Sequence, residues 1–263
     1  MRRIFLALIT STFILGCSSV ATDSKQNMEQ ENLTLATIWY QNSPEVKALY
    51  YQGFNIAQER VQEFQKQKSD RPKAVVVDLD ETMIDNSPFQ GKMIETGKPF
   101  TPEMWDEWVT LEKAEAMPGA VEFTQFCKMQ GIEVIYLSNR TVGQQQATMS
   151  NMHKLGFAFV KPENFYLKDT TSKKEPRRRR ISENFDIILL LGDNLNDFAQ
   201  VFEDRYEDWG KANVDGQRQQ FGRKFIVFPN PMYGEWEKNI YSYERVKDEE
   251  TRFSMRRETL KSF

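Results

Sequence analysis

The chain has 263 residues, with 35 lysines and arginines against 38 aspartates and glutamates, which gives a formal net charge of −3. This slightly acidic balance excludes a general electrostatic attraction to nucleic acid. The length is sufficient for one domain with a substantial core.

Residues 1–16 predict export. Two arginines follow the initial methionine, and a mostly apolar run then ends at Gly16, directly before Cys17. A short apolar segment behind positive charges is typical of a signal peptide, and it is too short to span a bilayer comfortably. In one interpretation, the segment is an ordinary secretory signal peptide and the cysteine after it is incidental.

The end of this segment, "ILGC", resembles a bacterial lipobox. The resemblance implies cleavage before Cys17, which becomes the lipidated N-terminus. It also implies that Ser18 directs sorting to an outer membrane. The polar residues that follow suit a flexible tether between lipid and domain, so we predict a lipid-anchored tether over 17–32.

Apolar and aromatic residues recur at helical spacing over 35–65. The pattern is interrupted at Ser43 and Pro44, which together form a start signal for a second helix. We predict two helices here, whose aromatic residues belong to the core.

Three short apolar runs, each ending in polar residues, follow along the chain. They cover 74–77 before Asp78, 132–137 before Ser138, and 187–191 before Gly192. Helical patterns separate them, one of which begins at Pro118-Gly119. Buried strands alternating with helices indicate a parallel sheet in an α/β domain.

Two acids follow the first of these strands directly, at Asp78 and Asp80. In open parallel sheets the ligand crevice lies at the carboxyl ends of the strands, so carboxylates there are well placed for chemistry. A charged loop that merely follows a strand is the alternative, because loop ends favour acids in any case.

The polar strand ends form an ordered set. They are "DLDET" from Asp78, "SN" from Ser138, a lysine near position 174, and "GDNLND" from Gly192. This order resembles the haloacid dehalogenase superfamily of phosphohydrolases. The sequence resembles one family within this superfamily more closely, the class C acid phosphatases, also called the lipoprotein e family of 5′-nucleotidases. The segments that carry this resemblance are "DLDETMIDNSPF", "SNR", "GDNLNDF" and the lipobox.

The resemblance extends from about residue 35 to residue 236. It implies a Rossmann-like parallel sheet of the haloacid dehalogenase type with helices on both faces. It also implies a small helical addition from the terminal segments and no large cap. A single phosphatase domain is then expected over 33–263, with its core at about 70–236.

The chemistry of phosphoester hydrolysis fits the spacing of the two acids. Asp78 is placed to attack phosphorus and form an aspartyl-phosphate. Asp80 is placed to protonate the leaving oxygen and then to activate water. A carboxylic acid ordinarily has a pKa near ~3.9, so protonation is easier in acid, which fits the acidic optimum that the resemblance implies.

A phosphate dianion beside carboxylates requires a cation. Mg²⁺ prefers octahedral oxygen ligands and retains several waters, so two carboxylates and a carbonyl suffice. Following the family motif, we assign the Asp78 carboxylate, the Asp80 carbonyl and the Asp193 carboxylate to Mg²⁺. Asp197 is expected to orient a ligand water or the lysine. A surface turn is the alternative for "GDNLND" alone.

The resemblance assigns phosphate binding to Ser138, Asn139 and Lys174. The sequence does not decide between Lys174 and its neighbour Lys173. The arginine run over 177–180 is predicted to be the solvated face of a helix rather than an RNA-binding patch.

Aromatic residues are expected near the leaving group. At positions matching Trp105 and Tyr233, relatives in the resembled family stack on the base of a nucleotide, and such stacking tolerates different bases. Trp108 is predicted to be a core residue. His153, the single histidine, is predicted to be structural, and a histidine-rich zinc site is not expected.

The sequence therefore predicts an exported, Mg²⁺-dependent acid phosphomonoesterase acting on 5′-nucleotides or nicotinamide mononucleotide. Its partners would be a small phosphomonoester and a membrane reached through the lipid, with no nucleic acid, and the resemblance suggests a homodimer. A surface lipoprotein that binds haem or acts as an adhesin is the alternative. A dehalogenase is disfavoured, because a halide leaving group needs no proton from Asp80.

Overall fold

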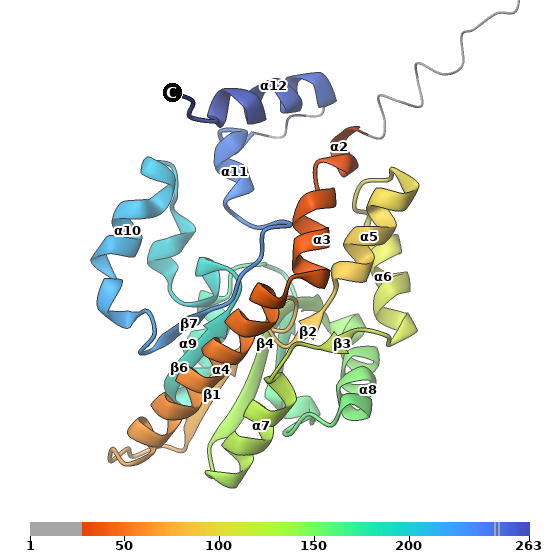
Figure 1. Ribbon diagram of the computed structural model, residues 1–263. Helices are drawn as coiled ribbons and strands as arrows, with labels where there is room; N and C mark the ends of the chain where they lie inside the picture. The colour runs from red at the N-terminus through yellow and green to blue at the C-terminus, as the bar shows by residue number, and fades with distance from the viewer. Residues whose placement is uncertain (1–27, 245, 247) are drawn as a thin grey trace, which may run out of the picture.

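The computed structural model describes residues 28–244, 246 and 248–263. A parallel five-stranded sheet of order β5-β4-β1-β6-β7 forms its centre (Figure 1). The strands are β1 (Lys73–Val77), β4 (Glu133–Thr141), β5 (Phe165–Lys168), β6 (Asp186–Gly192) and β7 (Phe225–Val227). The predicted α/β class is confirmed.

Helices cover both faces of the sheet, as predicted. They are α2 (Met28–Glu31), α3 (Thr34–Asn42), α4 (Pro44–Gln65), α5 (Ser87–Thr96), α6 (Pro102–Leu111), α7 (Ala120–Met129), α8 (Gln145–Leu155), α9 (Glu175–Asn184), α10 (Lys211–Gly216), α11 (Glu237–Ile240) and α12 (Glu249–Thr259).

Alternating residues of β1 belong to two separate hydrophobic cores. Val75 and Val77 pack in the larger core with residues of α4, α7 and α8. Ala74 and Val76 pack in the smaller core with Ile181 of α9. Because side chains of a strand alternate between the two faces, β1 is buried on both sides and reads as a continuous apolar run.

The N-terminal helices follow the predicted start signal. The Ser43 hydroxyl accepts a hydrogen bond from the Glu45 backbone N–H at 3.1 Å, and Pro44 occupies the first helical position of α4. The predicted tether extended to residue 32, whereas α2 already begins at Met28 and Gln30 is buried. The predicted signal peptide, Cys17 and the first part of the predicted tether lie outside the described residues.

The segment between β1 and β4 contains regular structure of its own. Short strands β2 (Ile84–Asp85) and β3 (Glu115–Ala116) pair antiparallel, and α5 and α6 lie between them. These two helices stand beside α3 in Figure 1. They form a small helical roof, and the expectation of no large cap is met.

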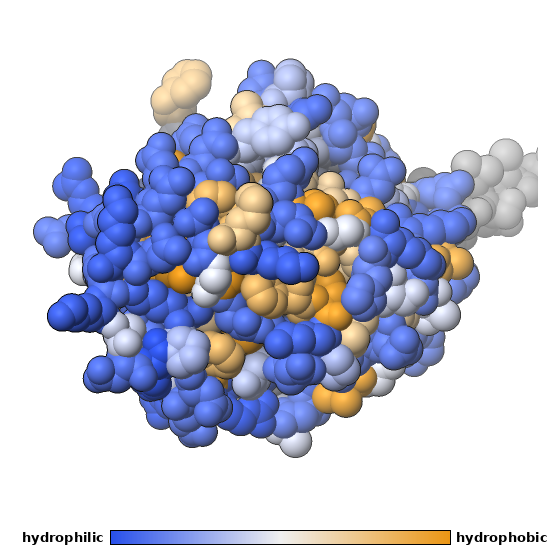
Figure 2. All heavy atoms as spheres, turned by 90° about the horizontal axis from the view of Figure 1, so that it is seen from below, coloured by the Kyte–Doolittle hydropathy of each residue, from blue (hydrophilic) through white to orange (hydrophobic). Residues whose placement is uncertain are grey.

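The C-terminal part supplies the predicted helical addition. After β7, the chain leads to α11 and α12, which lie at the same end of the molecule as α2 (Figure 1). Figure 2, seen from below the view of Figure 1, shows a mainly hydrophilic face with apolar side chains near its middle. Among the described helices, none combines the length and the apolar character needed to cross a membrane.

Candidate active site

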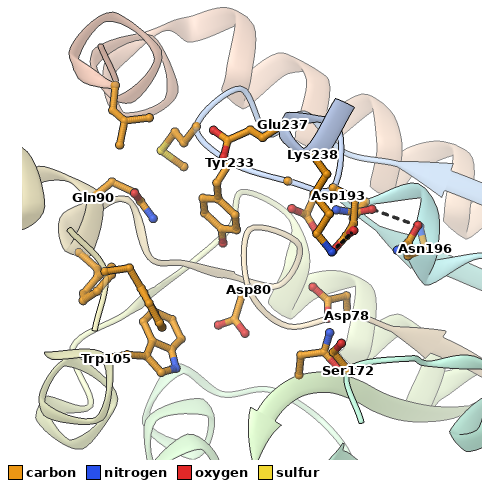
Figure 3. A pocket seen from close by; sticks show the side chains of 18 of the residues that line it. Asp78, Asp80, Gln90, Trp105, Ser172, Asp193, Asn196, Tyr233, Glu237 and Lys238 are labelled. Carbon is orange, nitrogen blue, oxygen red and sulfur yellow. Dashed lines mark hydrogen bonds and ion pairs between the residues drawn. The ribbon is translucent and has the colours of Figure 1, made fainter. Parts of the chain in front are cut away.

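A cavity of about 810 Å³ lies at the carboxyl ends of the sheet strands (Figure 3). It is lined by most of the predicted site residues, namely Asp78, Asp80, Trp105, Asn139, Lys174, Asp193, Asp197 and Tyr233. Ser138 is fully buried directly behind its wall. Residues far apart in the sequence thus meet where the resemblance implied.

Asp78 is the first residue after β1 and is buried beneath the cavity. Its backbone N–H donates to the Leu191 carbonyl at 2.9 Å, which extends the pairing of β1 with β6 by one residue. Its carboxylate contacts the Lys174 ammonium. Burial raises the pKa of Asp78 to about 7, although Lys174 opposes this shift.

Both adjacent lysines line the cavity, but Lys174 is the one that contacts the acidic residues at the strand ends. Its ammonium bridges Asp78 and Asp197, at 2.6 Å from the Asp197 Oδ1. Burial works to lower its pKa, but Asp197 and Asp78 outweigh burial, and the net pKa is raised. The Lys173 side chain is 67% exposed and pairs with Glu203 at 3.5 Å.

Asp78, Asp193 and Asp197 form an acidic cluster, and their carboxylate oxygens lie within 4.8 Å of one another. Burial, followed by the charges of Asp197 and Asp78, raises the pKa of Asp193 well above its ordinary value. Asn230 donates to the Asp193 carboxylate at 2.8 Å and so orients it. Hard carboxylate oxygens crowded at this distance suit a divalent cation.

Both carboxylate oxygens of Asp197 already have partners. Oδ1 contacts Lys174, and Oδ2 accepts from the Asn194 backbone N–H at 3.0 Å. A side chain at Gly192 would collide with the Asp197 carboxylate, so the glycine makes this approach possible. Asp197 thus contacts Lys174, one of the two partners expected for it, and its role stays a prediction.

The Asp80 carboxylate points away from the acidic cluster. Its Oδ1 accepts from Asn86 at 2.8 Å and from the Arg140 Nε at 2.9 Å, and its Oδ2 accepts from the Ser138 hydroxyl at 3.2 Å. Ser138 therefore contacts Asp80 from behind the cavity wall. The Asp80 carboxylate is therefore fully engaged by these three side chains.

The arginine run differs from its prediction. Only Arg179 and Arg180 are exposed, whereas Arg177 and Arg178 are buried. Arg177 donates to the Ser138 carbonyl at 2.6 Å and to the Asn139 Oδ1 at 2.6 Å. Arg178 donates to the carbonyls of residues 196 and 197 at 2.8 and 3.1 Å. The two buried arginines thus fix the strand-end loops that carry the site.

The predicted aromatic residues lie on different elements around the cavity. Trp105 of α6 packs edge-to-face on Phe89 of α5, with ring centroids 5.1 Å apart. Tyr233, in the loop after β7, donates its hydroxyl to the Glu81 carboxylate. Trp108 does not line the cavity, since it packs against the core and donates to Asn86 at 2.8 Å.

Four supporting residues escaped the sequence analysis. Arg140 is 2% exposed and holds Asp80, and Asn86 holds both Asp80 and Arg140. Glu81 is fully buried, adopts a positive φ of 58° and holds Tyr233. Asn230 holds Asp193. Glu81, Asn86 and Arg140 lie inside the quoted motifs, which is the signal that could have found them, whereas Asn230 lies in none of those motifs.

The profile of the haloacid dehalogenase superfamily, subfamily IIIB (Acid phosphatase), matches residues 1–236. The chain belongs to this family. Membership confirms the resemblance noted from the motifs, and it agrees with the acidic, oxygen-rich centre at the strand ends.

Members of the acid phosphatase family have been solved. A class C acid phosphatase from Bacillus anthracis superposes with a TM-score of 0.84 at 39% identity, covering 91% of this chain and 99% of that chain. The same kind of protein with tungstate bound gives a TM-score of 0.85 at 39% identity, covering 89% and 98%. The common fold thus includes nearly all the described residues.

Plant members are more distant. The "Stem 28 kDa glycoprotein" of Glycine max is 28% identical over 167 residues, which is 60% of this chain and 58% of that protein. "Acid phosphatase 1" of Solanum lycopersicum is 26% identical over 128 residues, or 46% and 50%. This chain thus spans about half the length of these two relatives.

Proposed function

We propose that this protein is a Mg²⁺-dependent acid phosphomonoesterase that works through an aspartyl-phosphate. The observation that carries the proposal is the arrangement around Asp78. This buried carboxylate lies at a strand end between Lys174 and the acidic cluster, and Asp80 lines the same cavity. Two relatives from Arabidopsis thaliana are named vegetative storage proteins, so family membership alone is not the basis for proposing activity. The basis is the set of residues around Asp78.

In the proposed first step, a carboxylate oxygen of Asp78 bonds to phosphorus as the bond to the leaving oxygen breaks. The leaving oxygen takes the electron pair of that bond and a proton from Asp80. The Oδ2 of Asp80 is the oxygen for this transfer, because it accepts one hydrogen bond, from the Ser138 hydroxyl, whereas Asn86 and Arg140 both donate to Oδ1. Lys174 offsets negative charge beside Asp78.

In the second step, Asp80 accepts a proton from water. The resulting hydroxide oxygen bonds to phosphorus, and the bond between phosphorus and the Asp78 oxygen breaks with its electrons returning to the carboxylate. Inorganic phosphate leaves, and both aspartates regain their starting states. Asn139, at the cavity wall, is placed to donate to a phosphoryl oxygen through its amide.

The Asp78 and Asp193 carboxylates and the Asp80 carbonyl would hold the cation, while Asp197 supports Lys174. A bound Mg²⁺ supplies positive charge to the phosphoryl oxygens. We propose Mg²⁺ because the nearby donors are hard oxygens, with neither cysteine nor histidine among the residues that line the cavity.

We propose nucleoside monophosphates and nicotinamide mononucleotide as substrates, because Trp105 and Tyr233 can offer ring faces to a base. Tungstate in the solved Bacillus anthracis relative is a tetrahedral oxyanion like phosphate, which supports an oxyanion pocket. The haem alternative receives no support, since His153 is exposed on α8 and does not line the cavity.

We also propose export, lipid attachment at Cys17 in an outer membrane, and a homodimer, on the lipobox and the resemblance. Incorporation of a radiolabelled fatty acid by the native chain and its absence in Cys17→Ser would support the anchor. Light scattering of the purified protein would test the dimer.

The activity test is phosphate release by the purified full chain from adenosine 5′-monophosphate, nicotinamide mononucleotide, ribose 5-phosphate and p-nitrophenyl phosphate. Each substrate is assayed with Mg²⁺ or with EDTA at mildly acidic pH. We expect turnover that EDTA abolishes and added Mg²⁺ restores. A folded protein that releases phosphate from none of the four substrates would contradict the proposal.

A further inference from the structure

Gln90 interrupts the buried face of α5. This face contains Ser87, Phe89, Gln90 and Met93, and Gln90 is only 6% exposed. A buried helix position ordinarily carries an apolar residue. An amide at such a position needs hydrogen bonds from protein, water or a ligand, and the polar atoms of Gln90 are open to the cavity rather than enclosed by protein.

Several other buried amides in the described residues have such bonds. Asn151 bonds to both backbone groups of Ala114 at 3.1 and 2.9 Å. Asn164 donates to the Val134 carbonyl at 2.7 Å, and Asn86 bonds to several partners. The Gln90 amide, in contrast, has no hydrogen-bond partner anywhere in the part of the chain that the structure describes.

The unpartnered amide faces the active-site cavity. Gln90 lines this cavity together with Trp105 and Tyr233. Figure 3 shows its side chain directed into the same space as the Tyr233 ring, with Trp105 farther along the same side. A ring held by Trp105 and Tyr233 would therefore present its edge to the amide.

A second glutamine also lines the cavity. Gln30 of α2 is likewise 6% exposed. Its Oε1 has no hydrogen-bond partner among the described residues, but this oxygen is enclosed and does not reach the cavity space. Gln90 is therefore the amide that can meet the edge of a ligand.

We propose that Gln90 is a specificity-determining residue that recognises the edge of a planar heteroaromatic leaving group. The group must carry an adjacent hydrogen-bond donor and acceptor, such as an exocyclic amine beside a ring nitrogen, or a carboxamide. A glutamine amide presents one donor and one acceptor side by side and pairs with such an edge through two bonds. This inference rests on the proposed function and identifies the substrate class of that site.

The energetics favour selection by Gln90. A substrate that lacks the matching group leaves the buried amide unpaired, whereas the matching substrate satisfies both sides. Stacking by Trp105 and Tyr233 accepts any base, so Gln90 would supply discrimination that the rings cannot.

Two pairs of matched substrates test the proposal. Adenosine 5′-monophosphate is compared with purine riboside 5′-monophosphate, which lacks the exocyclic amine. Nicotinamide mononucleotide is compared with nicotinic acid mononucleotide, in which a carboxylate replaces the carboxamide. We expect wild-type kcat/KM to favour the first member of at least one pair by about tenfold, carried by KM.

Gln90→Met keeps the side-chain length without polar atoms, and Gln90→Leu removes the amide in a shorter apolar side chain. Both variants should reduce the preference to within about twofold of unity, which corresponds to loss of the paired bonds. Gln52→Met, at an exposed position of α4, is the matched control and should keep the wild-type preference. A Tm close to wild type establishes that each variant is folded.

Calorimetric binding of the same nucleotides to each protein separates this inference from the proposed function. Loss of the binding preference in the Gln90 variants supports the inference, even if no phosphate is released from p-nitrophenyl phosphate or any nucleotide. A wild type without preference in either pair overturns it. A preference that survives in a folded Gln90 variant, or affinity lost equally for all four nucleotides, also overturns it.

Discussion

The floor and the roof of the cavity are held in different ways. The floor consists of charged residues at strand ends, namely Asp78, Lys174, Asp193 and Asp197. The roof consists of neutral residues on α5, on α6 and in the loop after β7, namely Gln90, Trp105 and Tyr233. Contacts between buried charges fix the floor, whereas the roof depends on ring packing and single hydrogen bonds.

This difference assigns the chemistry to the floor and the choice of substrate to the roof. Removing one member of a buried charge pair leaves an uncompensated charge, which is costly. Removing one neutral bond costs roughly 0.5–1.5 kcal/mol. Changes in the floor should therefore abolish turnover, and changes in the roof should shift KM among substrates.

The largest effect is expected for Asp78→Asn, which removes the nucleophile of the floor. Phosphate release should fall by roughly a thousandfold or more, because the remaining groups cannot replace a covalent step. Initial rates with all four substrates of the activity test measure this. Retention of more than about a tenth of the wild-type rate would show that another group attacks phosphorus.

Lys174→Ala should cost roughly a hundredfold in kcat, because charge stabilisation beside Asp78 is lost. Lys173→Ala is the matched control, since its exposed ammonium pairs only with Glu203 among the contacts described. We expect it to change kcat by no more than about twofold. The reverse ranking of the two variants would place the wrong lysine in the floor.

Two effects of pH on thermal stability are expected from the carboxylates of the floor. The stability without metal should decrease with pH, and the extra stability that Mg²⁺ gives should increase. Burial raises the pKa of Asp78 to about 7 from 3.8, so the folded state holds the proton more tightly than the unfolded state. This proton stabilises the folded state fully when the pH is below the pKa that Asp78 has in the unfolded state. The stabilisation is lost as the pH rises through the pKa that Asp78 has in the folded state. Asp193 shifts in the same direction.

In EDTA, Tm should therefore decrease between about pH 5 and about pH 8. A divalent cation binds the ionised carboxylates, so Mg²⁺ should raise Tm more at the higher pH. Thermal unfolding with and without Mg²⁺ measures the difference. An equal increase in Tm at both pH values, or the same increase in Asp193→Asn, would argue against a cation in the floor.

The smallest effect is expected for Tyr233→Phe in the roof. This variant keeps the ring and removes the hydroxyl that donates to Glu81. KM for nucleotides should rise by about threefold to tenfold as the ring loses its fixed position, while kcat stays close to wild type. An equal rise in KM for ribose 5-phosphate, which has no base, would show that the ring does not contact the base.

Much of the floor was predictable because its residues directly follow buried strands. The apolar run before Asp78 and the "GDNLND" segment each located a strand end. Parallel strands bring their carboxyl ends to one edge, so sequence order was enough to place these aspartates together.

The supporting contacts were not predictable, because they join distant segments. Arg177 lies in a run of four arginines that looks solvated, yet it is buried against the end of β4. Local charge pattern carries no information on such partners. The same holds for Glu81, whose partner Tyr233 lies 152 positions further along the chain.

The roof was anticipated only in part. Trp105 and Tyr233 came from resemblance, but the sequence analysis assigned no helix to α5 or α6. Gln90 carries no local signal, because its meaning depends on which face of α5 is buried.

Acid-quench trapping of the phosphoenzyme is the most direct test of the account. The purified full chain is mixed with a radiolabelled phosphomonoester, quenched in acid during turnover, digested and mapped. We predict hydroxylamine-labile label on the peptide that contains Asp78, and none in Asp78→Asn. Turnover with no trapped label, or label on another residue, would contradict an aspartyl-phosphate formed at the floor of the cavity.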